Sequence, residues 1–262
     1  MTKLDAPFAV LHIPHASVII GAEVRASFCI DDATLADELL QMTDWFTDEL
    51  FALDNLIASH VVYPVSRLVV DPERFIDDDA EPMAARGMGA IYTHTSRRAP
   101  LRHPMDTKSR EQLLHAHHRP HHARLATAID AALAAWNSCL VIDCHSFGSK
   151  AKAYEVDQSS WRPDICLGTD QYHSPQALVD SARQMFEDAG FTVELDRPFS
   201  GALVPSTHFQ RDPRVMALMV EVNRGLYMDE RSGERLKTFD IVRERLQQVV
   251  RGAIRFASKP TC

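Results

Sequence analysis

Three short runs of apolar residues, each accompanied by polar side chains, constrain this fold most. They cover residues 8–13, 138–142 and 216–222 and lie far apart in the chain. Runs this short and this apolar are typical of strands buried on both faces of a sheet. Long helical patterns separate them, so we expect an α/β fold whose sheet is covered by helices on both sides.

Helical periodicity and β-branched runs predict the remaining elements. The expected helices are 32–53, 108–136, 175–189 and 236–253, and the expected further strands are 61–65, 68–70 and 191–195. The second helix is expected to be broken or bent at Pro120, because proline removes a backbone donor. Residues 76–106 have no sustained period, which predicts a long loop of the kind that forms lids or binding segments. No repeat, low-complexity tract or linker divides the chain, so residues 1–262 are expected to form a single domain.

The charge balance argues against one class of partner. The 262 residues include 28 Lys and Arg against 36 Asp and Glu, which gives a formal net charge of -8. Nucleic-acid-binding proteins need a surplus of basic side chains for phosphate contacts, so no nucleic-acid partner is expected. An acidic small-molecule substrate would have to be held by a local cluster of arginines against the general field.

The sequence carries no mark of export or membrane insertion. Its first residues show neither the long apolar stretch nor the small-residue cleavage site of a signal peptide. No run of about 18 apolar residues occurs, so no membrane contact is expected. The 5 cysteines are scattered without a C-x-x-C pair, which argues against a disulfide framework or a structural zinc site. We therefore expect a reduced, cytoplasmic protein.

Polar side chains stand where the apolar runs end. His12-Ile13-Pro14-His15 closes the first run, Asp143-Cys144-His145 follows the second, and Glu221 lies within the third. Ligand sites of α/β sheets lie at the carboxyl ends of strands, and zinc takes imidazole and carboxylate ligands with one position left for water. A single histidine after a strand is more often a hydrogen-bonded structural residue. An acid inside an apolar strand is harder to explain, because burying an unpaired carboxylate is costly.

The two histidines of the first run have different interpretations. His12 lies within the strand and is expected to be structural, whereas His15 lies at its mouth. Asp143 and His145 are two residues apart in an extended segment, so their side chains can share a face. Asp143 could therefore orient a ligand histidine, a partner that such histidines commonly have.

Five sets of motifs in chain order resemble those of a known family. They are Ile13-Pro14-His15-Ala16, Thr43-Asp44-Trp45, Ser66-Arg67 with Asp71-Pro72-Glu73-Arg74, Asp143-Cys144-His145-Ser146, and Glu221-Val222-Asn223-Arg224 with Tyr227-Met228-Asp229-Glu230. Over residues 8–231 the chain resembles the N-formylglutamate amidohydrolase family, which is related to zinc carboxypeptidases and succinylglutamate desuccinylases. The resemblance implies a three-layer α/β/α sandwich with a mixed, mostly parallel central sheet, as in zinc exopeptidases, and one catalytic zinc ion.

The resemblance also implies the metal ligands. His15 resembles the first ligand, and His145 resembles the ligand after the central strand. Val18 stands where the related peptidases have a glutamate ligand, and valine cannot coordinate a metal. We take Asp44 as the replacement, with the alternative that it is the N-cap of a helix starting at Trp45. The same ligands would accept Co²⁺, Mn²⁺ or Ni²⁺.

Glu221 resembles the glutamate that activates the metal-bound water, and a structural salt bridge to Arg224 is the alternative interpretation. Arg67 and Arg74 resemble the arginines that polarise the carbonyl and hold the substrate carboxylate, and guanidinium groups suit such bidentate contacts. Arg224 is assigned to substrate binding as well. His208 also resembles a family position that could hydrogen-bond substrate, with a plain surface histidine as the alternative.

Two further groups attract attention for their residue types. Arg97 and Arg98, on the long loop, could close over a substrate, although adjacent loop arginines are usually just solvated. His115, His117, His118, His121 and His122 form the densest histidine cluster, which composition alone would assign to metal binding. Nothing near them in the sequence offers a buried acid or a strand end, so we expect a solvated helix face.

The function that the resemblance implies is zinc-assisted hydrolysis of N-formyl-L-glutamate to formate and L-glutamate, a step of histidine degradation. Two alternatives remain open. One is a hydrolase of the same chemistry with another N-acyl amino acid or a small peptide as substrate. The other is a metal-binding or interaction protein that keeps the fold without turnover.

Overall fold

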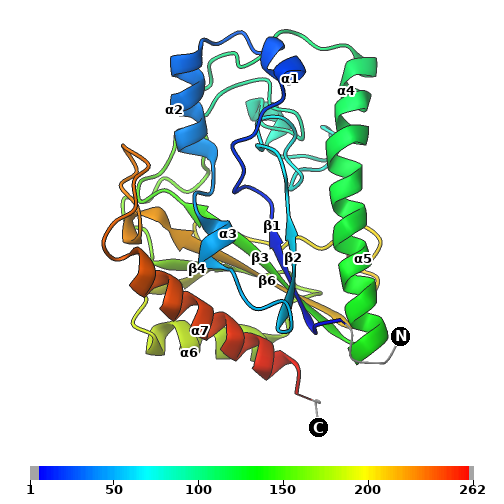
Figure 1. The fold of residues 1–262 in the computed structure, drawn as a ribbon, viewed down its shortest axis with the longest axis vertical. Helices are drawn as coiled ribbons and strands as arrows, with labels where there is room; N and C mark the ends of the chain where they lie inside the picture. The colour runs from blue at the N-terminus through cyan, green and yellow to red at the C-terminus, as the bar shows by residue number, and fades with distance from the viewer. Residues whose placement is uncertain (1–5, 260–262) are drawn as a thin grey trace.

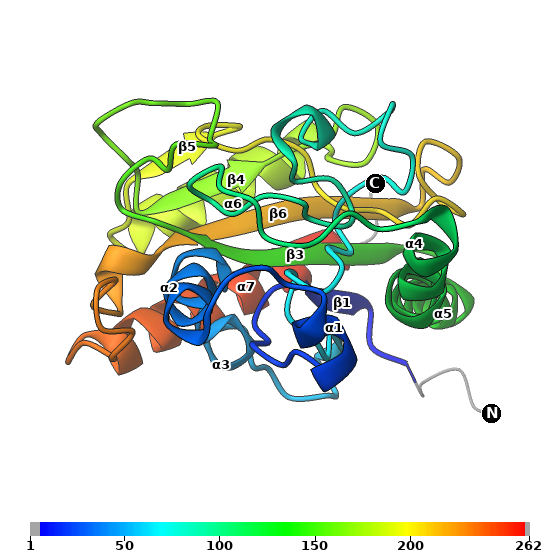
Figure 2. The ribbon, with the colours of Figure 1, turned by 90° about the horizontal axis from the view of Figure 1, so that it is seen from above.

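A mixed sheet forms the centre of the protein, seen in a computed structural model that describes residues 6–259. Six strands in this part of the chain pair in the order β2-β1-β3-β6-β4-β5 (Figures 1 and 2). The strands are β1 (Ala9–Ile13), β2 (Ala58–Val62), β3 (Cys139–Phe147), β4 (Ile165–Gly168), β5 (Val193–Leu195) and β6 (Val215–Asn223). Neighbours are parallel except β4, which runs antiparallel to β6. The expected mixed, mostly parallel sheet is confirmed.

Helices cover both faces of this sheet. They are α1 (Ala22–Ala26), α2 (Asp32–Met42), α3 (Thr47–Leu50), α4 (Thr107–Leu113), α5 (Arg119–Trp136), α6 (Gln176–Asp188) and α7 (Phe239–Ala257), with short turns η1 (Ala84–Arg86), η2 (Leu114–His118) and η3 (Arg224–Leu226). The larger core cluster lies between the sheet and α3, α6 and α7, and a smaller one lies between the sheet and α5. The α/β/α layering is therefore confirmed.

The alternation of side chains along the central strands decides what each face carries. Leu11 and Ile13 of β1 point into the larger core, whereas Val10 points into the core beneath α5. Because successive residues of a strand face opposite sides, His12 joins Val10 on the α5 face. The odd-numbered residues of β3 and β6 pair in register with Val10 and His12 and face this way too; the two strands run side by side through the middle of the molecule (Figure 2).

The long helical stretch is one rod and is not broken at Pro120 (Figure 1). Pro120 stands in the first turn of α5, directly after the π-helical turn η2. Proline has no N–H for the carbonyl four residues earlier, and a wider π turn accommodates that mismatch. Within residues 6–259, no helix has both the length and the apolar character needed to cross a membrane.

Other sequence-based expectations need correction. The helix expected over 32–53 is two helices, α2 and α3, because an extended residue, Thr43, ends the first. Residues 67–69 form a turn, and Leu68, Val69 and Val70 are buried against other loop residues, which explains their apolar composition. Strand β4 was not expected, since four residues are too few to show a period.

The central strand is longer than expected, and this matters for the site. β3 extends to Phe147, so Asp143 and His145 lie inside the strand and not beyond it. His145 is directly opposite Glu221 of β6, and Asp143 is opposite both Met219 of β6 and His12 of β1. The sheet itself therefore holds these polar side chains on the α5 face in fixed register.

Candidate metal centre and active site

Three side chains from distant parts of the chain meet near the carboxyl ends of β1 and β3. His15 follows β1, Asp44 lies between α2 and α3, and His145 lies in β3. All three are buried, with ligand-type atoms within 4.8 Å of one another. Asp44 Oδ2 is 3.5 Å from His15 Nδ1 and 3.0 Å from His145 Nδ1. Ligand atoms of a tetrahedral zinc ion lie roughly 3.3 Å apart at usual bond lengths, so the spacing suits such an ion.

Each histidine has a carboxylate on the side of its ring that faces away from Asp44. His15 Nε2 donates to Asp71 Oδ1 at 2.9 Å. His145 Nε2 lies 3.1 Å from Asp143 Oδ1, close but not aligned as a hydrogen bond. Carboxylates behind metal-binding imidazoles fix the ring and the tautomer. Both rings therefore present Nδ1 to the shared centre.

Arg224, the residue after β6, holds Asp44 in place. Its Nη2 donates to Asp44 Oδ1 at 2.8 Å, and its Nε donates to Ser146 Oγ at 3.1 Å. Burial would raise the pKa of Asp44, but His145, His15 and Arg224 outweigh it and hold the pKa well below its ordinary value. Asp44 is thus ionised, with one oxygen on the arginine and the other facing the histidines.

Two alternative interpretations of the sequence are wrong. Asp44 does not cap a helix starting at Trp45, because α3 begins at Thr47. Arg224 does not form its expected alternative pair with Glu221, because its carboxylate partner among residues 6–259 is Asp44.

Asp71 is the hydrogen-bond centre of the loop after β2. Besides the His15 ring, it accepts from Arg67 Nη2 at 2.7 Å, from the Tyr92 hydroxyl at 2.6 Å and from the backbone N–H of Glu73 at 2.9 Å. Burial would raise the pKa of Asp71, but Arg67 and His15 hold it well below its ordinary value. The fully buried carboxylate stays ionised and ties the arginine loop to the first histidine.

Two observations on the histidines point to a bound cation. His15 Nδ1 has no hydrogen-bond partner in the described chain, although buried polar atoms almost always have one. Burial would lower the pKa of His145, but Asp143 and Glu73 outweigh it and raise the pKa well above its ordinary value. An unpartnered imidazole nitrogen among ionised carboxylates fits a divalent transition metal.

Glu221 stands beside this group with a free oxygen. Its side chain is 8% exposed, and its Oε2 accepts no hydrogen bond from the residues that the structure describes. Burial raises the pKa of Glu221 to about 8, although His145 opposes the shift. A carboxylate with a pKa near neutrality is suited to taking up and releasing a proton.

A cavity of about 610 Å³ adjoins the site. Glu73, Arg74 and Asp143 line it, and Asp143 also contacts His145. Much of the remaining wall is apolar and consists of Phe75, Ile76, Leu203, Val204, Phe209 and Met219. Arg74 Nε has no hydrogen-bond partner among residues 6–259, and the guanidinium group lies 3.7 Å from Asp71 Oδ2 and 4.0 Å from Glu81 Oε1.

The histidine-rich start of α5 does not form a solvated face, and that expectation is wrong for its inner side. His118 and His121 are buried. His118 Nε2 lies 3.1 Å from the carbonyl oxygen of Arg74, and His122 Nε2 lies 2.7 Å from that of Pro72, each in hydrogen-bond geometry. These rings tie the loop that carries Arg74 to the helical rod of η2 and α5.

Three candidate residues are not brought to this group. His208 Nε2 bonds to Asp130 of α5 at 2.9 Å. Arg97 forms a surface ion pair with Asp37 at 2.7 Å. Arg98 lines a second cavity of about 350 Å³, whose lining residues differ from those of the cavity beside His145.

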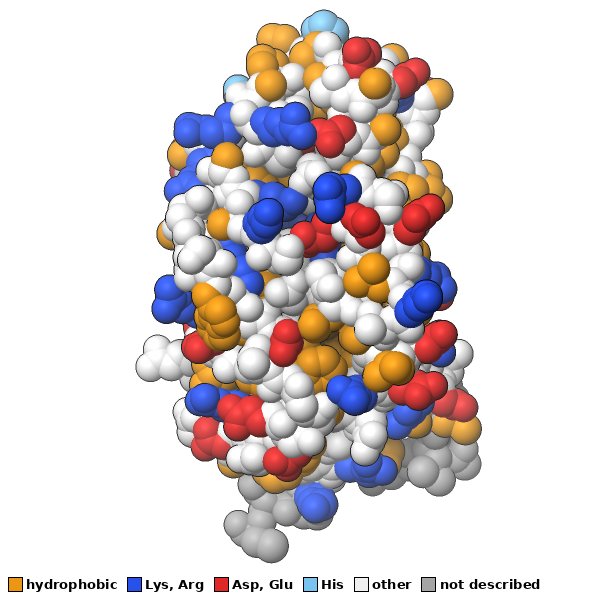
Figure 3. Space-filling view, turned by 90° about the vertical axis from the view of Figure 1, so that its left-hand side faces the viewer, with side chains coloured by type: hydrophobic (Ala, Val, Ile, Leu, Met, Phe, Trp, Pro, Cys, Tyr) orange, Lys and Arg blue, Asp and Glu red, His pale blue; other side chains and the backbone are white. Residues whose placement is uncertain are grey.

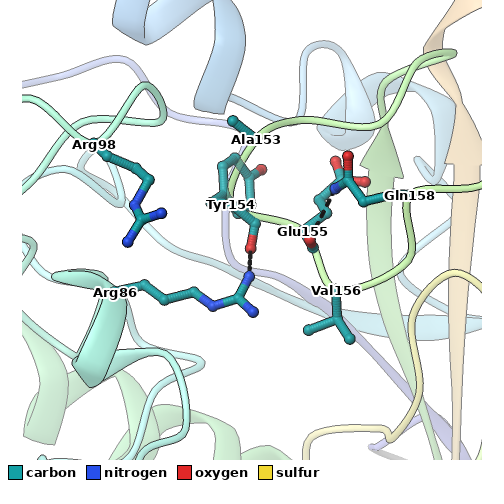
Figure 4. Close-up of a pocket in the computed structure, with 7 residues that line it drawn as sticks. All are labelled: Arg86, Arg98, Ala153, Tyr154, Glu155, Val156 and Gln158. Carbon is teal, nitrogen blue, oxygen red and sulfur yellow. Dashed lines mark hydrogen bonds between the residues drawn. The ribbon is translucent and has the colours of Figure 1, made fainter.

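Basic side chains gather around that second cavity. Figure 4 shows the guanidinium groups of Arg86 and Arg98 on one side of Tyr154, whose carbonyl oxygen accepts a hydrogen bond from Arg86. Figure 3 shows Lys and Arg side chains interspersed with Asp and Glu over one molecular face.

Sequence reasoning missed several residues that shape the site. Asp71 and Glu73 lay inside a quoted motif but received no role, although an acid directly before Pro72 was a visible signal. Tyr92 lies in the loop expected to be irregular and could not be connected to Asp71 without the tertiary structure.

Fold and site together define an α/β/α protein with a His–Asp–His centre at the carboxyl ends of its parallel strands. A family model described as N-formylglutamate amidohydrolase matches residues 8–228. The chain belongs to this family.

Solved structures agree on the fold. An N-formylglutamate amidohydrolase from Ralstonia eutropha JMP134 superposes with a TM-score of 0.82 at 22% identity, covering 96% of this chain and 93% of that one. A gene product from Agrobacterium tumefaciens superposes with a TM-score of 0.62 at 19% identity, covering 95% and 93%. Among curated proteins, none matches the chain in sequence.

Proposed function

We propose that the protein is a metal-dependent amidohydrolase that cleaves the formyl amide of N-formyl-L-glutamate to formate and L-glutamate, as in histidine degradation. Family membership supports hydrolysis of an amide. The observation that carries the metal dependence is the buried His15–Asp44–His145 group with Glu221 beside it. This arrangement gives a ligand set and a proton acceptor within one site.

The metal would be held by His15 Nδ1, Asp44 and His145 Nδ1. Zinc suits this donor set best, and cobalt, manganese or nickel are compatible with it. When bound, such an ion acidifies water and polarises a carbonyl. Asp71 and Asp143, behind the two rings, would keep the Nδ1 atoms available for the ion.

We assign the proton transfer of the reaction to Glu221. Glu221 accepts a proton from the water whose oxygen bonds to the acyl carbon, and it returns this proton to the amide nitrogen as the carbon–nitrogen bond breaks. Its raised pKa suits both halves of this exchange. To Arg67, 12% exposed and fixed on Asp71, we assign the stabilisation of negative charge on the acyl oxygen.

Arg74 is the residue that we assign to the substrate carboxylate. It lines the cavity, and its Nε is unpartnered within the described chain. Planar guanidinium groups bind carboxylates through two parallel hydrogen bonds. Arg224 is occupied by Asp44 and Ser146, so its contribution is to orient Asp44 and not to contact substrate. His208, bonded to Asp130, has no role in this mechanism.

The cavity favours a second candidate substrate class. Its volume of about 610 Å³ and its wall of Phe75, Leu203, Phe209 and Met219 would accept an apolar side chain larger than that of glutamate. The ionised Asp143 in the same wall would repel a second carboxylate. An N-acyl amino acid with an apolar side chain is therefore the alternative to N-formylglutamate.

Metal analysis and formate release test the proposal. Purified protein should contain one divalent ion per chain, and the double variant His15→Ala/His145→Ala should contain none. Glu221→Gln should keep the ion but lose about 10²–10⁴-fold in turnover, the usual contribution of a general base. Glu194→Gln, on β5 of the same sheet, is the matched control and should be unaffected.

A panel of N-formyl amino acids separates the two substrate classes. N-formylglutamate should be hydrolysed at least as fast as N-formylmethionine and N-formylphenylalanine if the first candidate is correct. The opposite order supports the apolar class. Hydrolysis that is unchanged in Glu221→Gln, or wild-type protein without metal, contradicts the proposed mechanism.

A further inference from the structure

A chain of hydrogen bonds runs from α5 to Asp143 beside the metal centre. Its members His121 and His12 have no role in the proposed mechanism. His121 Nδ1 lies 3.3 Å from Arg124 Nη2, and His121 Nε2 lies 2.7 Å from His12 Nε2. His12 Nδ1 lies 2.8 Å from Asp143 Oδ1. Both imidazoles are fully buried, so water does not replace these bonds.

The direction of every bond in the chain follows from either end. Arginine can only donate, so His121 Nδ1 accepts and its proton sits on Nε2. His121 then donates to His12 Nε2, which places the His12 proton on Nδ1. An ionised Asp143 can only accept, and it requires the same proton on His12 Nδ1. Burial lowers the pKa of His121 far below its ordinary value, in line with a neutral ring.

Asp143 is where this chain meets the metal centre. Its Oδ1 accepts from His12 and lies 3.1 Å from His145 Nε2, while its Oδ2 accepts from the backbone N–H of Leu203 at 2.9 Å. Because the His12 ring and the Leu203 N–H each bind one oxygen, the Asp143 carboxylate is held in a single orientation. Its position behind His145 in turn directs His145 Nδ1 towards Asp44.

We propose that His12 and His121 are positioning residues of the metal centre, which lock Asp143 behind the ligand His145. The inference rests on the proposed function for its metal, but the hydrogen-bond order holds without one. Neither residue belongs to the His15–Asp44–His145 group, although His12 lies close to Glu73 and Asp143, whose carboxylates form a second potential ligand group with it. The chain joins α5 to the sheet and gives the inner histidines of this helix a role in metal affinity.

Two substitutions of His121, by Leu and by Gln, distinguish a positioning role of this residue from a role in packing alone. His121→Leu fills the space without a donor, so His12 Nε2 loses its partner and the His12 ring can adopt the other tautomer, which repels Asp143. Partners behind metal ligands typically change metal affinity by about 10–100-fold. We expect this loss of Zn²⁺ affinity in His121→Leu, measured by competition with a chromophoric chelator. His121→Gln keeps an N–H near the same place and should recover most of it.

Leu125→Ala is the matched control. Leu125 lies one turn further along α5 and is also fully buried, so its truncation costs stability without touching the hydrogen-bond chain. It should lower resistance to urea and leave Zn²⁺ affinity unchanged. Equal Zn²⁺ affinities in wild type, His121→Leu and Leu125→Ala would overturn the inference, as would equal losses in all variants at position 121.

The ¹⁵N NMR shifts of the imidazole nitrogens in metal-free protein report the tautomers directly, so this test requires neither bound metal nor an activity assay. The His12 ring should carry its proton on Nδ1 and the His121 ring on Nε2. His121→Leu should shift His12 towards a mixture of tautomers, and His121→Gln should not. A His12 proton on Nε2 in wild type contradicts the inference. Absent hydrolysis with the expected tautomers would count against the proposed function alone.

Discussion

Asp71→Asn is the substitution whose effect the structure defines most sharply. Asparagine keeps the volume and one acceptor oxygen but removes the charge that holds Arg67 and the His15 ring. Asp71 is 0% exposed and Arg67 is 12% exposed, so the guanidinium group would be left buried without its counter-ion. Removing one partner of a buried pair costs about 3–5 kcal/mol, a large share of the roughly 5–15 kcal/mol that stabilises a domain.

The chain offers a control with the same bond length. Arg25 Nη2 lies 2.7 Å from Asp32 Oδ1, as Arg67 Nη2 lies 2.7 Å from Asp71 Oδ2, but the Asp32 side chain is 94% exposed. Exposed pairs contribute at most about 1 kcal/mol. Asp32→Asn should therefore change the free energy of unfolding by much less than Asp71→Asn.

Urea denaturation, followed by tryptophan fluorescence, measures both variants. The pKa of Asp71 is lowered in the folded state, so its stabilising effect is complete above the unfolded value of about 3.9 and is lost as pH falls below it. The difference between wild type and Asp71→Asn should thus be full at pH 7 and shrink below about pH 4. A loss no larger than that of Asp32→Asn at pH 7 would refute the reasoning from burial.

Three further outcomes are expected. In metal-free protein, the free energy of unfolding of Glu221→Gln should increase relative to that of wild type as pH rises from about 4.5 to 8. The reason is that Glu221 keeps its proton in the folded wild type over this range, whereas the unfolded chain releases it. A difference in urea denaturation that does not depend on pH contradicts this. Arg224→Lys should weaken Zn²⁺ binding in chelator competition, because an ammonium cannot span Asp44 and Ser146 together; unchanged affinity contradicts it. Zn²⁺ at 1,000 times its dissociation constant should stabilise wild type by about 4 kcal/mol but not His15→Ala.

Local sequence pattern was sufficient to predict the layers and the edge of the sheet where the site lies. Buried parallel strands must be apolar throughout, so His12, His145 and Glu221 stood out as exceptions within or beside them. Strand order and register could not be predicted from local sequence pattern, because strand pairing joins segments that are far apart in the chain. The pairing of His145 with Glu221 is one such fact.

The prediction of a solvated histidine face on α5 was wrong because it used composition and not the position of each histidine on the helix. His118 and His121 share a helix face with Leu114, Leu125 and Ile129, which are all buried. This spacing of three and four residues is the mark of an inward face, and it was present in the sequence. The histidines were judged by their number, whereas their position relative to the apolar stripe would have predicted burial. Their partners, on the strand and the loop, still required the fold.

Asp44 illustrates the opposite case, in which the structure decides between two sound local interpretations. Aspartate before a helix is a common N-cap, and nothing in the local sequence excludes that role. The helix begins only at Thr47, and the carboxylate instead faces His15, His145 and Arg224. Only the tertiary contact between distant segments makes it a candidate ligand.

The charges around the centre explain why a divalent ion fits it. Among the residues that the structure describes, five carboxylates surround the two histidines against three guanidinium groups. The carboxylates are Asp44, Asp71, Glu73, Asp143 and Glu221, and the guanidinium groups are those of Arg67, Arg74 and Arg224. The excess of two negative charges equals the charge of one divalent ion. Without it, burial raises the pKa of Glu221 to about 8, and Asp143 and Glu73 outweigh burial and raise the pKa of His145, so protons occupy the site. Metal binding must then displace protons, so affinity should increase with pH through this range.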